Sequence, residues 1–221
     1  MKPYFETELG KLYNCDCLEF MQTMEDKSVD LCLCDPPYGI NIAVKGFGGT
    51  KKIPHTEFSN VKSWDIKPDK ETFSQILRSS KNQIIWGGNY FTDYLYPSPC
   101  WLLWDKRCGV IPERTYADGE MAWTSFKQPT RIFRYIWDGM LQGNMKHKEE
   151  RRHPTQKPSP LIMWCLKRFD GDVFDPFLGS GTTAVACEKL GRKWIGIEIS
   201  EKYCEIAARR ISAEASQIKL F

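Results

Sequence analysis

The stretch VFDPFLGSGTT, residues 173–183, places a short apolar run, an Asp-Pro turn and two glycines in direct succession. The apolar residues predict a strand that ends at Asp175, and a helix is expected to begin a few residues later. Gly179 and Gly181 allow the backbone to turn sharply and to approach a ligand closely. The stretch has neither the third glycine of the dinucleotide fingerprint nor the Gly-Lys-Ser/Thr ending of a P-loop. It therefore predicts a ligand-binding strand–turn–helix unit that serves neither a nicotinamide dinucleotide nor a nucleoside triphosphate.

Apolar runs alternate with helical stretches on both sides of this unit. Strands are predicted at Lys11–Asn14, Val29–Cys34, Gln83–Trp86, Cys100–Trp104, Val173–Asp175 and Lys193–Glu198. Helices are predicted at Leu18–Met24, Pro68–Ser79, Pro158–Arg168, Thr182–Leu190 and Glu201–Ile211. Alternation of this kind is typical of an α/β fold built on a sheet.

Two segments interrupt the alternation. Residues 39–63 are rich in Gly and Lys and predict a loop. Residues 106–152 combine strand-like runs, Met121–Phe126 and Arg131–Trp137, with Gly, Pro and basic residues. They predict a small insert, placed on the sheet, within one domain that spans residues 1–221.

The composition excludes several classes of protein. The 221 residues are 42% hydrophobic and 27% charged, which is typical of one folded, water-soluble domain. No apolar run reaches the roughly 20 residues that a transmembrane helix needs, and the N-terminal residues MKPYFETELG lack an apolar signal region, so we expect a cytoplasmic protein. The nine cysteines include no Cys-x-x-Cys pair and are accompanied by only three histidines. This pattern disfavours both a disulfide framework and a metal site.

The net charge of +3 is unevenly distributed. Residues 41–62 carry four lysines against Glu57, and residues 127–157 carry eight basic residues against three acidic ones. Two basic segments on an otherwise acidic chain predict a surface that binds a polyanion. The candidate contacts are Lys45, Lys51, Lys52, Arg131, Arg134, Lys146, Lys148, Arg151 and Arg152.

The run Asp35-Pro36-Pro37-Tyr38 follows the predicted strand Val29–Cys34. Ligands bind at the carboxyl ends of strands in open parallel sheets. The two prolines donate no N–H and leave rigid carbonyl acceptors beside a carboxylate, and the tyrosine ring can stack on a planar ligand. An ordinary strand-ending turn has the same residue types. The functional alternative is a site for the exocyclic amino group of a nucleobase.

Two further features accompany these motifs. Glu198 ends a strand 17 residues after Gly181, about the spacing at which an acid meets the ribose hydroxyls of an adenosine-containing cofactor. The run His153-Pro154-Thr155-Gln156-Lys157-Pro158 opens the helix before the glycine turn, and by itself it predicts only a helix start.

Together, these residues resemble the β-class amino-methyltransferases of DNA, the circularly permuted methylases of adenine N6 and cytosine N4. DPPY is similar to the family's catalytic motif, DPFLGSGTT to its S-adenosylmethionine loop and HPTQKP to its third signature. Leu12–Cys17 is similar to the strand-and-acid segment that precedes the catalytic strand. The order catalytic motif, variable insert, HPTQKP and cofactor loop is the permuted order of this class. The resemblance thus implies that residues 106–152 are a small target-recognition insert. The likeness covers about residues 11–38, 83–105 and 153–210.

The resemblance implies a Rossmann-like methyltransferase fold, with a seven-stranded, mostly parallel sheet that has one antiparallel strand, and S-adenosylmethionine as cofactor. The catalytic residues that it implies are Asp35, Pro36, Pro37 and Tyr38. The cofactor-binding residues that it implies are Asp16, Cys17, Asp35, Thr155, Gln156, Lys157, Asp175, Phe177, Gly179, Ser180, Gly181, Thr182, Glu198 and Ile199.

The resemblance implies a restriction–modification methylase that acts on the N6 amino group of adenine in double-stranded DNA. Asp35 favours adenine, because Asp at this position is usual in the family's adenine enzymes and Ser is more frequent in its cytosine enzymes. The alternatives are a cytosine-N4 methylase, a methylase of RNA, a catalytically idle nucleic-acid-binding module and, more distantly, a dinucleotide oxidoreductase. The sequence leaves open the recognition sequence, a homodimer and a separate restriction endonuclease.

Overall fold

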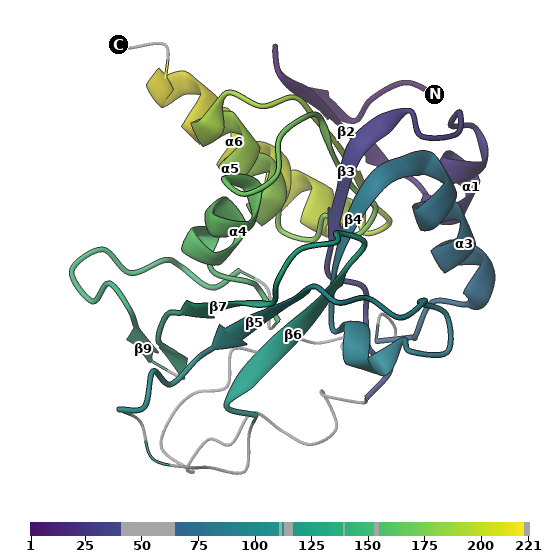
Figure 1. Ribbon diagram of the computed structural model, residues 1–221. Helices are drawn as coiled ribbons and strands as arrows, with labels where there is room; N and C mark the ends of the chain where they lie inside the picture. Colours follow the sequence, from purple (N-terminus) through teal and green to yellow (C-terminus); the bar gives the residue numbers. More distant parts are fainter. Residues whose placement is uncertain (41–64, 111, 113–116, 139, 153–154, 219–221) are drawn as a thin grey trace.

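The computed structural model describes residues 1–40, 65–110, 112, 117–138, 140–152 and 155–218 (Figure 1). The main sheet has nine strands in the order β1-β2-β11-β10-β3-β4-β6-β5-β7. Their bounds are β1 Phe5–Glu6, β2 Gly10–Asn14, β3 Val29–Cys34, β4 Ser80–Trp86, β5 Trp101–Asp105, β6 Gly119–Thr124, β7 Arg131–Arg134, β10 Val173–Asp175 and β11 Trp194–Glu198.

The seven strands from β2 to β5 confirm the predicted α/β fold. Neighbours from β2 through β4 all pair in parallel, whereas β6 is antiparallel to both β4 and β5. The sheet differs from the prediction at its two edges, where β1 pairs with β2 and β7 pairs with β5. These two additional edge strands raise the number from seven to nine.

Helices cover both faces of the sheet (Figure 1). One face carries α4, α5 and α6, and the other carries α1, α3 and the 3-10 helix η1. Their bounds are α1 Cys17–Gln22, α3 Lys70–Ser79, η1 Gly88–Tyr90, α4 Ser159–Leu166, α5 Thr182–Leu190 and α6 Glu201–Ile218. None of the helices in these described parts of the chain is long and apolar enough to cross a membrane.

Two apolar clusters result from the alternation of side chains along the strands. On β3, Leu31 and Leu33 pack in the cluster under α4, α5 and α6, whereas Cys32 and Cys34 pack in the cluster under α3. The nine cysteines are free thiols, and six of them are buried. Cys165, Cys187 and Cys204 lie in the first cluster. Burial on both faces explains why the central strands are almost continuously apolar.

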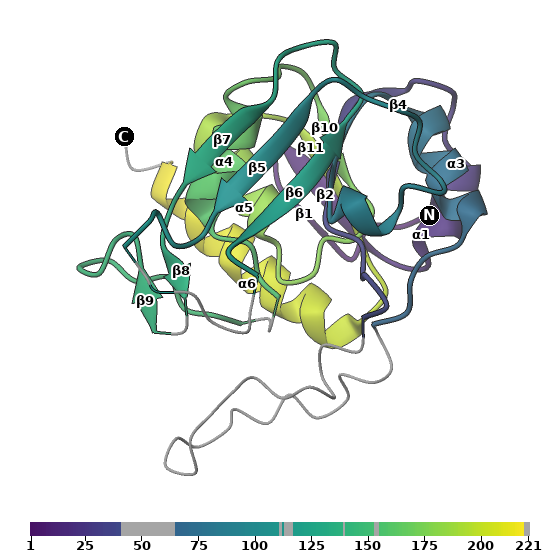
Figure 2. The same ribbon diagram turned by 60° about the horizontal axis from the view of Figure 1, so that its bottom comes forward.

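The segment 106–152, expected to be an insert placed on the sheet, contributes to the sheet itself. β6 lies between β4 and β5, with Trp123 opposite both Ile85 and Trp101. Among the residues of this segment that the structure describes, only β8 (Trp137–Asp138) and β9 (Leu141–Gln142) form a separate two-stranded ribbon (Figure 2). β6 and β7 of this segment are thus paired with strands of the main sheet, and the insert itself stays a prediction. Target recognition by this segment stays a prediction.

Arg192 joins the end of α4 to the turn that leads into β10. Its Nη1 donates to the carbonyl oxygens of Leu166 and Phe169 at 2.8 and 2.6 Å, and its Nε donates to that of Gly171 at 2.9 Å. The last carbonyls of a helix have no partner within the helix, so a guanidinium is well suited to them.

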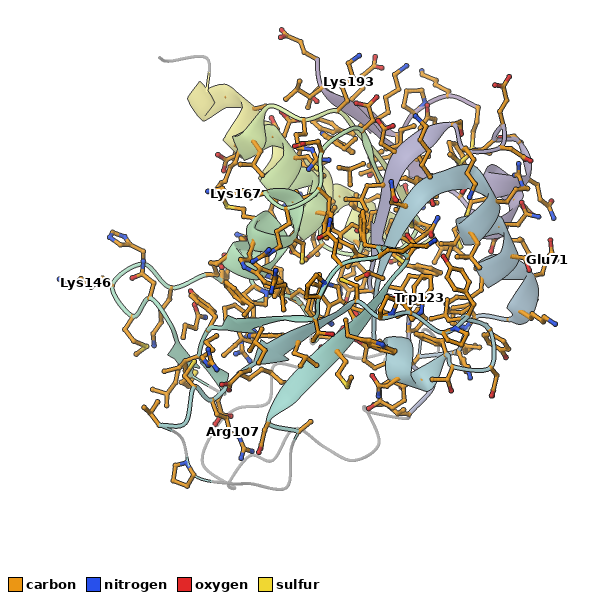
Figure 3. The ribbon with its side chains drawn as sticks, viewed as in Figure 1. Glu71, Arg107, Trp123, Lys146, Lys167 and Lys193 are labelled. Carbon is orange, nitrogen blue, oxygen red and sulfur yellow. The ribbon has the colours of Figure 1, made fainter. Side chains whose placement is uncertain are left out.

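We predict that Arg192→Met destabilises the chain by about 1.5–3 kcal/mol, because three carbonyl groups lose a charged donor. The free energy of unfolding in urea measures this loss. The neighbouring Lys193 is exposed at the surface (Figure 3), so Lys193→Met should change stability by no more than about 0.5 kcal/mol. Equal effects of the two substitutions would contradict the assigned role of Arg192.

Candidate active site

Four acidic residues lie at one edge of the parallel sheet. Asp16, Glu198, Asp175 and Asp35 stand at or just after the carboxyl ends of β2, β11, β10 and β3. These four strands are neighbours in this order. Parallel pairing therefore places residues from distant parts of the sequence along one edge, where ligands bind in open α/β sheets.

Asp35, Tyr38 and Lys157 meet at the end of β3. The Tyr38 hydroxyl donates to Asp35 Oδ1 at 2.6 Å, and Lys157 Nζ donates to Asp35 Oδ2 at 2.5 Å. Lys157 Nζ also donates to the Tyr38 hydroxyl oxygen at 3.2 Å. The catalytic-type motif and the HPTQKP motif, which are predicted separately, thus form one site.

Glu120 and Lys106 extend this site. Glu120 lies on β6, with its Oε2 3.0 Å from Lys157 Nζ and its Oε1 2.7 Å from Lys106 Nζ. Neither residue is predicted from the sequence, because no recognised motif surrounds them. Only the pairing of β6 between β4 and β5 brings Glu120 to Lys157.

The pKa values of this cluster reflect a balance between burial and neighbouring charge. Burial raises the pKa of Asp35, which Lys157 partly offsets, and Glu120 raises it further. Burial would also raise the pKa of Glu120, but Lys157 and Lys106 outweigh it and lower the value to about 2. Burial would lower the pKa of Lys157, but Asp35 and Glu120 outweigh it and the net direction is upward. The cluster therefore holds Lys157 and Glu120 charged at neutral pH.

The Tyr38 ring stacks on a second aromatic ring. The centroids of Tyr38 and Tyr90 are 4.8 Å apart at an interplanar angle of 22°, and Tyr90 is 40% exposed. Gly87, with a φ of +69°, lies against the edge of the Tyr38 ring, and a Cβ there would stand 2.1 Å from Tyr38 Cε1. Gly87 is therefore required both for the turn after β4 and for the placement of Tyr38. The Gly-Gly-Asn-Tyr sequence after a strand is the signal that could have identified this element.

The two glycines of the cofactor-type loop have different surroundings. Gly179 has a φ of +55°, and a Cβ there would have only the Phe177 carbonyl oxygen within 4.0 Å. Gly181 has a φ of +86°, and a Cβ there would lie 2.9 Å from the Cβ of Ala207 on α6. Close packing of α5 against α6 thus explains Gly181, whereas Gly179 leaves open space beside the backbone.

Asp175 and Glu198 are the two carboxylates nearest this loop. Asp175 accepts a hydrogen bond from the Phe177 N–H at 3.0 Å and another from Thr183, yet burial outweighs both and raises its pKa to about 7. Glu198 accepts from the N–H groups of Gly179 and Ser200, each at 2.8 Å. Burial also raises the pKa of Glu198 despite these hydrogen bonds. At this edge of the sheet Asp175 is therefore buried and Glu198 half-buried.

Other predicted cofactor residues contact the protein itself. Arg210 on α6 donates to Ser180 Oγ at 2.9 Å and to Thr182 Oγ1 at 3.3 Å. Ser180 Oγ in turn donates to Gln156 Oε1 at 3.3 Å. These contacts brace the start of α5 against α6 and against the segment before α4.

The remaining predicted cofactor residues differ in their contacts and in their exposure. Asp16 caps α1 by accepting from the N–H groups of Leu18 and Glu19 at 2.8 and 3.2 Å, and Cys17 is the first residue of that helix. Ile199, next to Glu198, is 69% exposed. Phe177 and Thr155 are half-buried.

The predicted DNA-binding residues that the structure describes are exposed. Arg131 and Arg134 lie on the edge strand β7, and the others follow β9, where Lys146 projects away from the body of the protein (Figure 3). The exposed residues after β9 are Lys146, Lys148, Arg151 and Arg152. The Arg151 guanidinium stands 4.4 Å from the centroid of Trp137, and Arg152 pairs with Glu150. Lys45, Lys51, Lys52, His153 and Pro154 lie outside the described residues.

The chain is similar in sequence to known DNA methylases. The sequence model of the DNA methylase family N6_N4_Mtase matches residues 112–209. The Type II methyltransferase M2.MboI of Moraxella bovis is 28% identical, over 95% of this chain and 91% of its own length.

Two solved structures have the same fold. The M1.HpyAVI complex with S-adenosylmethionine superposes with a TM-score of 0.57 at 20% identity, covering 92% of this chain and 99% of the other. The cytosine-N4-specific PvuII DNA methyltransferase superposes with a TM-score of 0.63 at 17% identity, covering 98% and 95%. The three motifs, their meeting at one edge of the sheet and these likenesses lead to one conclusion: the chain is similar, in sequence and in fold, to the N6/N4 family of DNA methylases.

Proposed function

We propose that the protein transfers a methyl group from S-adenosylmethionine, the family's methyl donor, to the N6 amino group of adenine in double-stranded DNA. The observation that carries the proposal is the meeting of Asp35 and Tyr38 with Lys157, one strand away from Asp175. The relatives' names as Type II methyltransferases support a role in restriction–modification.

The residues at the ends of β2, β11 and β10 fit the cofactor. Gly179 leaves open space beside the loop backbone, and Asp175 offers a buried carboxylate to the positively charged methionine end. Glu198 suits the ribose hydroxyls, because its two hydrogen bonds use only part of the four or so lone-pair positions of a carboxylate. The exposed Ile199 and the nearby Asp16 suit the adenine end. When bound, S-adenosylmethionine supplies an electrophilic methyl group on a sulfonium.

Asp35 and Tyr38 fit the target base. The lone pair of an exocyclic amino group is delocalised into the base, so the nitrogen is a poor nucleophile. The Asp35 carboxylate and the Pro36 carbonyl accept its two hydrogens and orient the lone pair toward the methyl group. Catalysis is then mainly positioning and electrostatic stabilisation. The Tyr38 ring stacks on the base after its extrusion from the duplex, since the amino nitrogen cannot be attacked within the helix.

Methylation of cytosine N4 is the second candidate function. The PvuII structural neighbour has this specificity, although its 17% identity is evidence for the fold alone. Cytosine also carries an exocyclic amino group that two acceptors and a stacking ring would hold. Asp35 favours adenine through the resemblance of its motif to the adenine enzymes.

The first prediction concerns the modified base. Plasmid DNA incubated with the chain and S-adenosylmethionine should yield N6-methyladenine when digested to nucleosides and analysed by mass spectrometry. Asp35→Ala removes one of the two acceptors of the amino group, so the rate should fall by about a hundredfold or more, while cofactor binding is retained. Detection of N4-methylcytosine in the digest would show that the target base is cytosine and not adenine. Absence of any modified base would contradict the proposed activity.

The second prediction uses the raised pKa of Asp175. The folded protein binds this proton more tightly than the unfolded chain, so the carboxyl group destabilises the fold increasingly as the pH rises from about 4 to about 7. Asp175→Asn should therefore raise the melting temperature of the cofactor-free protein most at pH 8, much less at pH 5, and hardly at all below about pH 4, where the carboxyl group is protonated in both states. The substitution should also abolish thermal stabilisation by S-adenosylmethionine, which in the wild type amounts to about 2.7 kcal/mol at 100 times the dissociation constant.

Asp170→Asn provides a matched control, because Asp170 is an exposed aspartate near the same strand. It should leave both the pH dependence and the stabilisation by cofactor unchanged. If S-adenosylmethionine stabilises the Asp175→Asn protein as much as the wild type, Asp175 does not belong to the cofactor site.

The third prediction concerns the basic surface. Arg131, Lys146 and Lys148 are exposed, and their replacement by Ala should weaken DNA binding. The slope of log K against log salt should also fall by about 1 for each phosphate that is deprived of its cation. Fluorescence anisotropy with a labelled duplex measures both quantities. Lys167→Ala with Lys193→Ala, which alters a different part of the surface (Figure 3), is the control and should have little effect. An unchanged slope in the triple variant would show that the DNA binds to a different surface of the protein.

A further inference from the structure

The resemblance assigns Lys157 to the cofactor, but its ammonium contacts the proposed base site. Three oxygen atoms surround Nζ: Asp35 Oδ2 at 2.5 Å, Glu120 Oε2 at 3.0 Å and the Tyr38 hydroxyl at 3.2 Å. A lysine ammonium has three N–H donors and no acceptor. The side chain of Lys157 is only 7% exposed, so two hydrogen bonds, to Asp35 and Tyr38, and the ion pair with Glu120 take the place of water.

We propose that Lys157 and Glu120 are positioning residues for Asp35: Lys157 orients the carboxylate, and Glu120 draws part of the ammonium charge away from it. This inference rests on the proposed function, in which Asp35 accepts a hydrogen of the target amino group. A lysine paired with Asp35 alone would compete with the base for the carboxylate oxygens. Sharing of the lysine with Glu120 weakens this competition while Asp35 stays in place.

The cluster is balanced in charge. Lys106 and Lys157 carry two positive charges, and Glu120 and Asp35 carry two negative charges, with Glu120 between the two lysines. Removal of one member of a buried ion pair leaves a charge without compensation, which is more costly than removal of both. Single and paired substitutions should therefore have effects that do not add.

The proton affinity of Asp35 provides a readout that a merely structural role would not move. A protonated carboxyl group can donate its hydrogen and accepts poorly, so methyl transfer should fall on the acidic side as Asp35 becomes protonated. The charged groups that act on Asp35 are Lys157 before α4, Glu120 on β6 and Asp175 on β10, while the Tyr38 hydroxyl donates to it. Lys106 acts through Glu120.

The experiment measures kcat for methyl transfer against pH, with DNA and S-adenosylmethionine saturating. Glu120→Gln removes a negative charge, so the acidic limb should move to lower pH by about one pH unit. Lys157→Met removes the counter-ion, so the limb should move to higher pH by at least as much, and kcat at pH 7 should fall more than tenfold. In the double variant Lys157→Met/Glu120→Gln, the acidic limb of the profile should lie between those of the two single variants. The double variant should also recover part of the kcat that Lys157→Met loses.

Lys81→Met is the matched control. Lys81 pairs with Asp30 at 2.7 Å near the start of the same strand β3, but both side chains are more exposed. Its loss should leave the pH profile unchanged. Glu120→Gln preserves shape, so it tests the proposal even where Lys157→Met does not fold.

Two outcomes would overturn the positioning role, provided that the wild type transfers methyl groups. In the first, the acidic limbs of the two single variants move in the same direction. In the second, the Glu120→Gln profile is identical to that of the wild type. A wild-type chain that binds S-adenosylmethionine and transfers no methyl group at any pH would instead overturn the proposed function. The two failures are thus distinguished by the wild-type rate.

Discussion

Parallel hydrogen bonding between β2, β11, β10, β3 and β4 is the constraint on which the site depends. It places five strand ends at one edge, with the candidate site residues at these ends or in the turns that follow. A cofactor-type loop and a base-type motif, 140 residues apart in sequence, become neighbours because β10 and β3 share a ladder. The helices on both faces stabilise this arrangement by burying apolar side chains of alternate residues.

The strand ends and their motifs are predictable because the signals are local. Val29–Cys34 is continuously apolar apart from Asp30, and two prolines stop the strand directly after Asp35. Glu120 is not predictable in this way, because its role depends on the register of an antiparallel strand with two distant partners. The segment that contains it resembles an insert in composition, yet its strand is part of the sheet. Gly181 illustrates the converse: its presence is predictable, but its close approach to Ala207 is a tertiary contact.

Charge and burial act against each other throughout the site. Asp175 is buried with few compensating donors, so its pKa rises, whereas Glu120 is buried between two lysines and its pKa falls. At neutral pH the chain thus holds one carboxyl group about half protonated and another fully ionised on neighbouring parts of the same edge. A protein selected for stability alone would replace both with apolar residues, so their retention is consistent with a site that must bind polar ligands.

The reactivity of the buried cysteine thiols can report local opening of the fold. Burial raises the pKa of Cys187 to about 12 and that of Cys165 higher still, so both remain protonated and unreactive while the helices stay in place. Cys32 and Cys34 occupy the opposite layer. Alkylation of each thiol therefore requires local opening of the layer that covers it. The rates at which the two sets of cysteines react would show whether the two helical layers separate from the sheet together or independently.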